Sequence, residues 1–195
     1  MSLKYALLAS LEAAARSGYD IAREFTTGVG YFWHARHQQI YRELARMVDA
    51  GEVVFETVAQ QGRPAKKLYR ITTAGEQALC AWLQAPAAEP VVRNELLVKL
   101  YVGHLAPPGT LLAEIRRHQA RAAARLAEYR ALEERYFGDP TALPESAQYI
   151  YLTLRRGISS VAAWLEWAAE VETFLTARAA AAASPAPHGG RDAAG

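Results

Sequence analysis

The sequence predicts a mainly α-helical protein with one small β-hairpin, divided into two domains. Three observations predict this fold class. Apolar residues recur at spacings of three and four over most of the 195 residues, which is typical of amphipathic helices. Between residues 52 and 71 this spacing gives way to two strand-like runs around a turn that contains Gly and Pro. Two prolines in segment 85–90 then interrupt the helical pattern and indicate a linker.

The first domain begins with three helical segments. Leu3, Leu7 and Leu11 share one face of a helix that we expect to end near Gly18, because Gly can cap it. A second, short helix is expected to begin there. A third helix is expected over residues 35–50, since its apolar residues fall at i, i+4, i+7 and i+8. These residues are Ile40, Leu44, Met47 and Val48.

A β-hairpin and a fourth helix complete this domain, which spans residues 1–84. We expect strands over residues 53–58 and 66–71, joined by a tight turn. Thr73 is followed three residues later by Glu76, a capping-box pattern that predicts the start of the fourth helix. The order helix, helix, helix, strand, strand, helix is the outline of a winged helix-turn-helix. The sequence therefore points to a DNA-binding regulator.

The first turns of the third helix carry the side chains that we expect to read DNA bases. A helix fits the major groove of B-DNA, and residues near its N-terminus usually reach the base edges. Gln can form two hydrogen bonds with adenine, and Arg can do the same with guanine. The alternative is that these polar residues only form a solvated helix face. The expected base-reading residues are Arg36, His37, Gln38, Gln39 and Arg42.

The hairpin, or wing, concentrates positive charge in a chain whose net charge is only +2. Residues 62–70 contain four Lys or Arg residues and no acidic residue, which favours phosphate attraction. Tyr69 alternates with Ile71, so we expect its ring to pack on the third helix first and its hydroxyl to contact phosphate second. Alternatively, the lysines protect an exposed strand edge. The expected wing and phosphate contacts are Arg63, Lys66, Lys67 and Tyr69.

The second domain, residues 91–178, is predicted to be all helical and antiparallel. Helices are expected over residues 94–104, 110–137 and 145–177, followed by a disordered tail at 179–195 that has little to bury. The last helix carries two apolar stripes. The preceding antiparallel helix can cover one, and a second subunit is the natural cover for the other. The expected dimer contacts are Leu154, Ile158, Val161, Leu165, Ala168 and Leu175.

Aromatic residues are concentrated on the same last helix. They could line a pocket for a small aromatic ligand near the dimer contact. The alternative is that aromatic residues at helical spacing belong to the core. The residues concerned are Tyr149, Tyr151, Trp164 and Trp167.

Motifs and composition argue against several other classes of protein. The five histidines lack metal-ligand spacing, and we find no phosphate-binding glycine loop or nucleophile elbow, so we expect no enzyme, metal or cofactor. Cys80 is the single cysteine, which rules out an intrachain disulfide. The N-terminus lacks the features of a signal peptide, and no segment approaches the roughly 20 apolar residues of a membrane span. We expect a soluble cytoplasmic protein without a membrane partner.

Several short motifs resemble those of the PadR-type transcriptional regulators. In the first domain these are SGYDI at 17–21, IYREL at 40–44, DAGEV at 49–53 and LYRIT at 68–72. In the second domain, NELLVKLY at 94–101 and WLEW at 164–167 resemble the helical C-terminal domain of the virulence-activator branch. Together the motifs span most of the chain from Leu3 to Ala177.

The resemblance implies a homodimer joined through its C-terminal helices, with a winged-helix domain on each arm. It further implies binding to double-stranded DNA at a (pseudo)palindromic operator, usually as a repressor. Some relatives respond to phenolic acids or bind flat aromatic drugs between subunits. Ser17 stands where members often have His, and Arg36 and His37 stand where smaller residues are common, so the operator sequence is expected to be particular to this protein. The alternative function is a dimeric ligand-sequestering or protein-interaction module that keeps the winged-helix shape without specific DNA binding.

Overall fold

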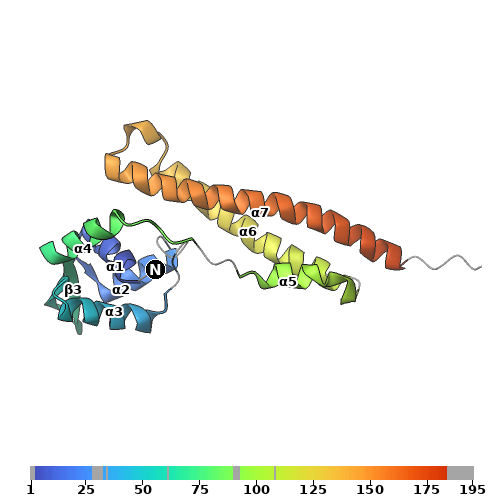
Figure 1. The fold of residues 1–195 in the computed structure, drawn as a ribbon. Helices are drawn as coiled ribbons and strands as arrows, with labels where there is room; N and C mark the ends of the chain where they lie inside the picture. The colour runs from blue at the N-terminus through green and yellow to red at the C-terminus, as the bar shows by residue number, and fades with distance from the viewer. Residues whose placement is uncertain are drawn as a thin grey trace, which may run out of the picture. The chain divides into compact units, whose positions relative to one another are not determined.

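The chain forms two compact units, Met1–Val91 and Val92–Gly195 (Figure 1). The computed structural model describes residues 3–27, 33, 35–60, 62–89, 93–107 and 109–183. The first unit combines helices with a small sheet, and the second is built from helices. Within the described residues, no helix is both long enough and apolar enough to cross a membrane.

The first unit contains four helices and a three-stranded antiparallel sheet within its described residues. In the sheet β3 lies between β1 and β2. Phe55 pairs with Tyr69 and Val58 pairs with Lys66, with an irregularity between Val58 and Gln60 near the turn. The elements are α1 (Leu3–Glu12), β1 (Arg16–Ser17), α2 (Gly18–Thr27), α3 (His37–Asp49), β2 (Val53–Gln60), β3 (Arg63–Ile71) and α4 (Thr73–Leu83).

The core of this unit is one cluster of apolar side chains. Helix α1 contributes Leu7, Leu8 and Leu11, which are almost fully buried. Burying a Leu or Ile side chain contributes about 1.5–3 kcal/mol, so this cluster is the main source of the unit's stability. Other elements contribute Ile21, Phe25, Ile40, Leu44, Met47, Val53, Tyr69, Ile71 and Leu79.

Two predicted boundaries in this unit are wrong. Helix α1 ends at Glu12 rather than near Gly18, because Arg16 and Ser17 pair with β3 as a short strand. The Ser17 hydroxyl then accepts a hydrogen bond from the backbone N–H of Asp20 at the start of α2 (3.1 Å). Helix α4 is capped by Thr72 instead of Thr73, since the Thr72 hydroxyl accepts from the Gly75 N–H (3.2 Å).

The second unit is dominated by a long antiparallel pair of helices (Figure 1). Leu96, Ile115 and Ala168, one from each of the three α-helices among its described residues, form its buried centre. The last helix, predicted to end at residue 177, continues to Ala183, because alanine has the highest helix propensity. Residues 184–195 of the predicted tail lie outside the described residues. The elements are α5 (Glu95–Tyr101), η2 (Gly103–Leu105), α6 (Thr110–Tyr136), η3 (Pro140–Ala142) and α7 (Glu145–Ala183).

Charged side chains connect α6 with the other helices of this unit. Lys99 of α5 lies 2.9 Å from Glu114, and Arg116 lies 2.7 Å from Glu172 of α7. Near the loop end of the pair, the Glu133 carboxylate accepts hydrogen bonds from Arg155 (2.9 Å) and from the Tyr151 hydroxyl (3.0 Å). These contacts fix the alignment of α7 on α6.

Among the described glycines of the first unit, Gly75 tolerates a side chain least. A Cβ there would overlap the Glu52 carbonyl oxygen and lie 2.8 Å from Cγ1 of Ile71. The carbonyl belongs to the backbone and cannot rotate away, so we expect Gly75→Ala to destabilise the unit by about 1–3 kcal/mol. Thermal unfolding of the variant measures the loss. Gly138→Ala is the control, since the nearest atom to its Cβ is 3.8 Å away; equal unfolding midpoints for both variants would contradict this prediction.

The Glu133 contacts predict a pH dependence of stability. The hydrogen bond from Arg155, and then that from Tyr151, lower the pKa of Glu133 below its usual value near 4.5. A lowered pKa in the folded state means that the stabilisation is complete above the unfolded-state pKa and is lost as pH falls through the folded-state pKa. We expect Glu133→Gln to reduce stability at neutral pH and to flatten its decline in acid, measured by urea unfolding at several pH values. Glu128→Gln, an exposed position on the same helix, should leave the pH profile unchanged.

Candidate DNA-binding surface

Helix α3 has one buried face and one polar face. Ile40, Leu44 and Met47 are almost fully buried in the core, as their spacing predicts. Gln38 and Arg42 are exposed and lie four residues apart, so they share the face directed away from the core. The first turn of α3 contains no acidic residue. This face therefore offers a hydrogen-bonding amide and a guanidinium to a ligand in front of it.

The other predicted base-reading residues have different positions. Arg36 precedes α3 in an extended conformation (φ −80°, ψ 148°), and His37 is the first residue of the helix. The backbone N–H of Arg36 donates a hydrogen bond to Oε1 of Gln39 (2.9 Å). Gln39 therefore helps to cap the helix, and its carbonyl oxygen is occupied within the protein. Among the five residues, Gln38 and Arg42 lie one turn apart on the exposed face of α3.

The wing places its lysines beside aromatic side chains. Lys67 is exposed, and its Nζ lies 4.1 Å from the centroid of the Phe55 ring. Lys66 is half-buried. Tyr69 is 7% exposed and belongs to the core, and burial raises the pKa of its hydroxyl above the usual value. The backbone of Arg63 pairs opposite Gln60 near the turn, while its side chain lies outside the described residues.

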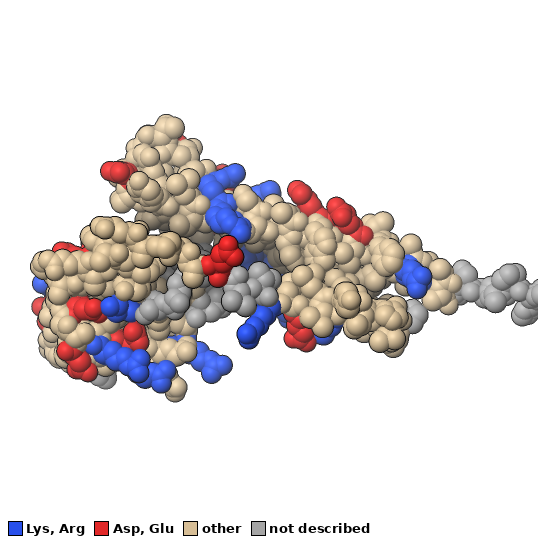
Figure 2. Space-filling model, viewed as in Figure 1, with Lys and Arg blue, Asp and Glu red and all other residues tan. Residues whose placement is uncertain are grey.

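Positive side chains gather on the side of the first unit along which α3 runs (Figures 1 and 2). Acidic residues are interspersed among them. Arg46 lies 3.5 Å from Glu43, and Arg70 lies 3.9 Å from Glu56. Exposed ion pairs of this kind contribute little to stability, but the carboxylates offset the charge of these two arginines. The positive potential then depends more on Arg42, Lys66 and Lys67.

The predicted dimer stripe on α7 is partly used within a single chain. Ile158 is 6% exposed and Ala168 is fully buried. Ala168 shares its cluster with Ile115 of α6. The remaining residues of the stripe are half-buried, namely Leu154, Val161, Leu165 and Leu175.

The four aromatic residues predicted for a ligand pocket form separate groups. Trp164 and Trp167 contact each other with ring centroids 5.9 Å apart. Tyr151 donates to Glu133 and lies 5.4 Å from the Phe137 ring, while Tyr149 is largely exposed. Trp164 follows Tyr151 by thirteen positions along α7, a rise of about 20 Å. One small ligand within a single chain could therefore contact the tryptophan pair or Tyr151, but not both.

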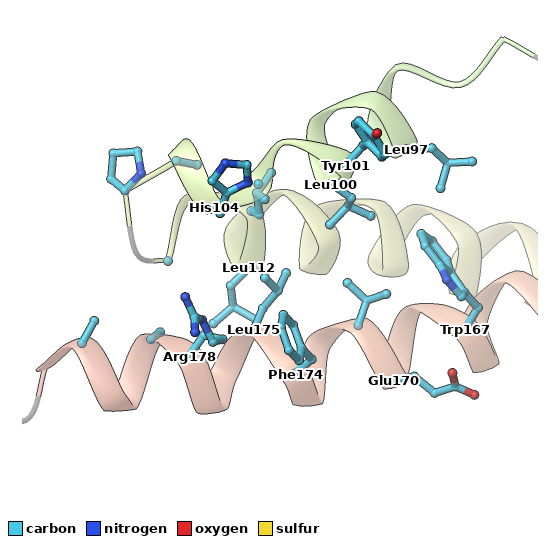
Figure 3. A pocket seen from close by; sticks show the side chains of 18 residues that line it. Leu97, Leu100, Tyr101, His104, Leu112, Trp167, Glu170, Phe174, Leu175 and Arg178 are labelled. Atoms are coloured by element: carbon cyan, nitrogen blue, oxygen red, sulfur yellow. The ribbon is translucent and has the colours of Figure 1, made fainter.

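The second unit also contains an apolar groove that the sequence did not reveal. It has a volume of about 810 Å³ and lies where α5, η2, the start of α6 and the end of α7 come together (Figure 3). Leu100, Leu112 and Phe174 lie between the helices, whereas Glu170 points away. Trp167 is the predicted pocket residue that lines this groove. One feature of the sequence could have indicated the groove: the apolar residues of the short helix α5 occupy more than one face, so this helix needs more than one neighbour.

Large apolar side chains remain exposed around this groove. Tyr101 is 88% exposed, and Val98 and Phe174 are 65% and 64% exposed. Three others lie near the start of α7, at the opposite end of the helix pair, namely Tyr149, Ile150 and Leu152. Exposed large apolar side chains that gather around a groove are typical of association surfaces, so this end of the second unit is a candidate for one.

Comparison with protein families matches both units. Residues 7–81 match the model described as the transcriptional regulator PadR-like family, and residues 92–176 match the model described as virulence activator alpha C-term. The probable transcriptional regulator Rv1176c of Mycobacterium tuberculosis is 37% identical over 185 residues, which cover 90% of this chain and 98% of the relative. The negative transcriptional regulator PadR of Bacillus subtilis is 42% identical over 101 residues, 51% of this chain and 55% of the relative.

Solved structures are similar over nearly the whole chain. The virulence activator AphA of Vibrio cholerae has 34% identity and a TM-score of 0.73, covering 91% of this chain and 99% of its own. Bacillus subtilis PadR in complex with operator DNA has 28% identity and a TM-score of 0.77, covering 89% and 98%. The same protein in complex with p-coumaric acid has 27% identity and a TM-score of 0.72, with the same coverage.

These similarities confirm the predicted fold class, a winged helix followed by a helical domain. They also confirm that the resemblance found in the sequence extends over both units. This chain belongs to the PadR-like family of transcriptional regulators, which are DNA-binding proteins and not enzymes.

Proposed function

We propose that this regulator is a homodimeric repressor that acts in the cytoplasm on a (pseudo)palindromic operator. The observation that carries the proposal is the polar face of α3, where Gln38 and Arg42 stand side by side above a buried apolar face. Such a face can enter a major groove and form the paired hydrogen bonds that distinguish adenine and guanine. The structure of Bacillus subtilis PadR with operator DNA supports the same use of the fold. The name of that relative, a negative regulator, supports repression.

The wing would supply binding energy that does not depend on sequence. Lys66 and Lys67 lie on the strand that leaves the turn, and Arg63 begins that strand. Cations near DNA phosphates gain affinity by releasing condensed counterions, whatever the base sequence. The Tyr69 ring belongs to the core, so it contributes to this contact through its hydroxyl. The wing therefore complements α3, which would choose the sequence.

Dimerisation would occur through the second unit. Ile158 and Ala168 of the predicted stripe are already buried, so their contribution is mainly to packing within the chain. The exposed side chains around the apolar groove, Tyr101 and Phe174 among them, would then carry most of the contact with a second subunit. Half-buried Leu154, Val161, Leu165 and Leu175 would flank it. A dimer with two-fold symmetry presents two α3 helices to two half-sites of the DNA. The operator of such a dimer is expected to be palindromic for this reason.

A small aromatic effector would release the repressor from DNA. The complex of Bacillus subtilis PadR with p-coumaric acid supports this proposal. In this chain Trp164 and Trp167 form an aromatic pair, and the His118 ring lies 6.3 Å from Trp164. Flat aromatic rings and a nearby imidazole suit a planar phenolic ligand. Tyr149 and Tyr151 could join this site only through the second subunit.

Substitutions on α3 test sequence reading. In binding titrations with a duplex selected from a random pool by the full-length protein, we expect Gln38→Ala and Arg42→Ala to lower affinity for the selected duplex by about 1–3 kcal/mol each. Arg42 also contributes charge, so Gln38→Ala should change affinity for random DNA least. Gln39→Ala is the matched control: it removes a cap, and its effect should be similar on both duplexes.

The same titration tests the proposed function as a whole. If the wild-type protein binds its selected duplex no better than random DNA at moderate salt, sequence-specific regulation is ruled out. That result would favour a protein-interaction or ligand-sequestering module with a winged-helix shape.

Charge placed in the apolar groove tests the dimer. Tyr101→Glu and Phe174→Glu should convert a protein with the mass of two chains into one with the mass of a single chain, because each would bury an unpaired carboxylate at the contact. Light scattering measures the mass. Thr173→Glu, on a different side of α7, is the control and should remain dimeric. A wild-type protein with the mass of one chain at micromolar concentration would contradict the proposal.

A further inference from the structure

A second concave surface lies on the first unit, where the start of α2, the middle of α3 and the outgoing strand of the wing meet. This cleft has a volume of about 720 Å³. Three tyrosines line it, one from each element: Tyr19, Tyr41 and Tyr69. Lys66 and Lys67 add positive charge, and the Lys67 ammonium also lies over the Phe55 ring. The cleft is thus rich in hydroxyl donors around two ammonium groups, unlike the apolar groove of the second unit.

Tyr41 lies to one side of the pair formed by Gln38 and Arg42 on α3. At about 100° per residue, it is rotated by about 100° from Arg42 and by about 60° from Gln38. Its ring lies against Gly18 at the start of α2. A Cβ at position 18 would overlap the edge of this ring and would lie 3.1 Å from its hydroxyl oxygen. The absence of a side chain at Gly18 therefore permits the observed position of Tyr41.

Charges around the cleft leave its positive groups available. Asp20 is the acidic residue of the lining, but its carboxylate accepts a hydrogen bond from the Ser17 hydroxyl (2.7 Å). That bond, followed by the charges of Arg23 and Lys66, lowers the pKa of Asp20. The carboxylate is thus held at the beginning of α2 by its own capping interaction. Lys66 lines the cleft from β3, as does Tyr69, whose ring belongs to the core.

We infer that this cleft binds one backbone phosphate of DNA. Lys66 would neutralise the phosphate, the hydroxyls of Tyr19 and Tyr41 would donate hydrogen bonds to its oxygens, and Gly18 would act as a positioning residue for Tyr41. A phosphodiester carries one negative charge and several acceptor oxygens, which this set of groups matches. The inference rests on the proposed function and extends it, because it assigns a phosphate contact to the junction between α3 and the wing. Such a contact fixes the depth and register of α3 without reading a base.

Single substitutions in the full-length protein test the cleft. We expect Tyr19→Phe and Tyr41→Phe each to weaken binding by about tenfold, equally for the selected duplex and for random DNA, because a phosphate contact carries no sequence information. Lys66→Gln should also reduce the slope of log affinity against log salt by about 0.9, the value for one phosphate. Tyr5→Phe is the matched control, since that ring stacks on Trp82 in the same unit. It should leave DNA affinity unchanged.

The contacted phosphate can be located by replacing the phosphates of the selected duplex, one at a time, with uncharged methylphosphonate groups. At one position in each half-site, the effect of Tyr41→Phe should disappear, because the acceptor is already altered. If the losses of affinity from Tyr41→Phe and from the methylphosphonate were additive at every position of the duplex, the inference would be overturned.

Gly18 is tested through its coupling to Tyr41. Gly18→Ala should weaken binding in the wild-type background but have no further effect when combined with Tyr41→Ala, since its role is to place that ring. The tyrosine and lysine variants do not depend on the folding of the Gly18 variant. If wild-type protein binds its selected duplex and all three of those variants bind within twofold of it, the cleft has no phosphate role while the proposed function stands. If the wild-type protein selects no duplex, both fail.

Discussion

The burial of Ile40, Leu44 and Met47 is the constraint on which the DNA-binding surface depends. These three residues lock the rotation of α3 about its own axis, because turning the helix would expose them and lose about 1.5–3 kcal/mol for each side chain. Once the rotation is fixed, Gln38 and Arg42 have to face outward, and Tyr41 has to lie beside α2. The same packing that stabilises the first unit therefore decides which polar groups a ligand can reach.

Periodic features of the fold could be predicted from the sequence, and contacts between distant segments could not. The spacing of apolar residues predicted α3, the wing and the long helix pair to within a few residues. Strand β1 was missed, since two residues, Arg16 and Ser17, are too few to show alternation. At the candidate site the polar residues at the start of α3 were found, but neither the Gln39 cap nor the contact between Gly18 and Tyr41 was. The second of these joins positions 23 residues apart and leaves no local pattern.

Helix α7 shows how an excess of apolar surface relates to assembly. One side packs on α6, and Ala168 at its centre is small enough to let the two helices approach closely. Another side carries Phe174, which remains exposed beside the groove lined by α5. The sequence pattern indicated two apolar sides and did not decide which of them faces a second subunit; the stripe expected at the dimer contact includes two residues that are buried within the chain. A hydrophobic pattern gives the number of neighbours that a helix needs, whereas burial in the folded chain identifies the side that is already covered.

Base reading and phosphate binding make different physical demands, and the sites proposed for them lie on different elements of this fold. Paired hydrogen bonds to a base need side chains whose position is accurate to a fraction of an ångström, a demand that Gln38 and Arg42, the proposed base-reading residues, could meet on a helix with a rigid core behind it. Phosphate attraction acts over about 8 Å at physiological salt and tolerates a looser arrangement, so the wing can carry it on a hairpin. A small change in the depth of α3 in the major groove would break the hydrogen bonds to bases without weakening the attraction to phosphates. The phosphate contact proposed for the hydroxyl-lined cleft would hold α3 at the same depth on any sequence. It would therefore add affinity equally to specific and random DNA and leave the choice of bases to the helix.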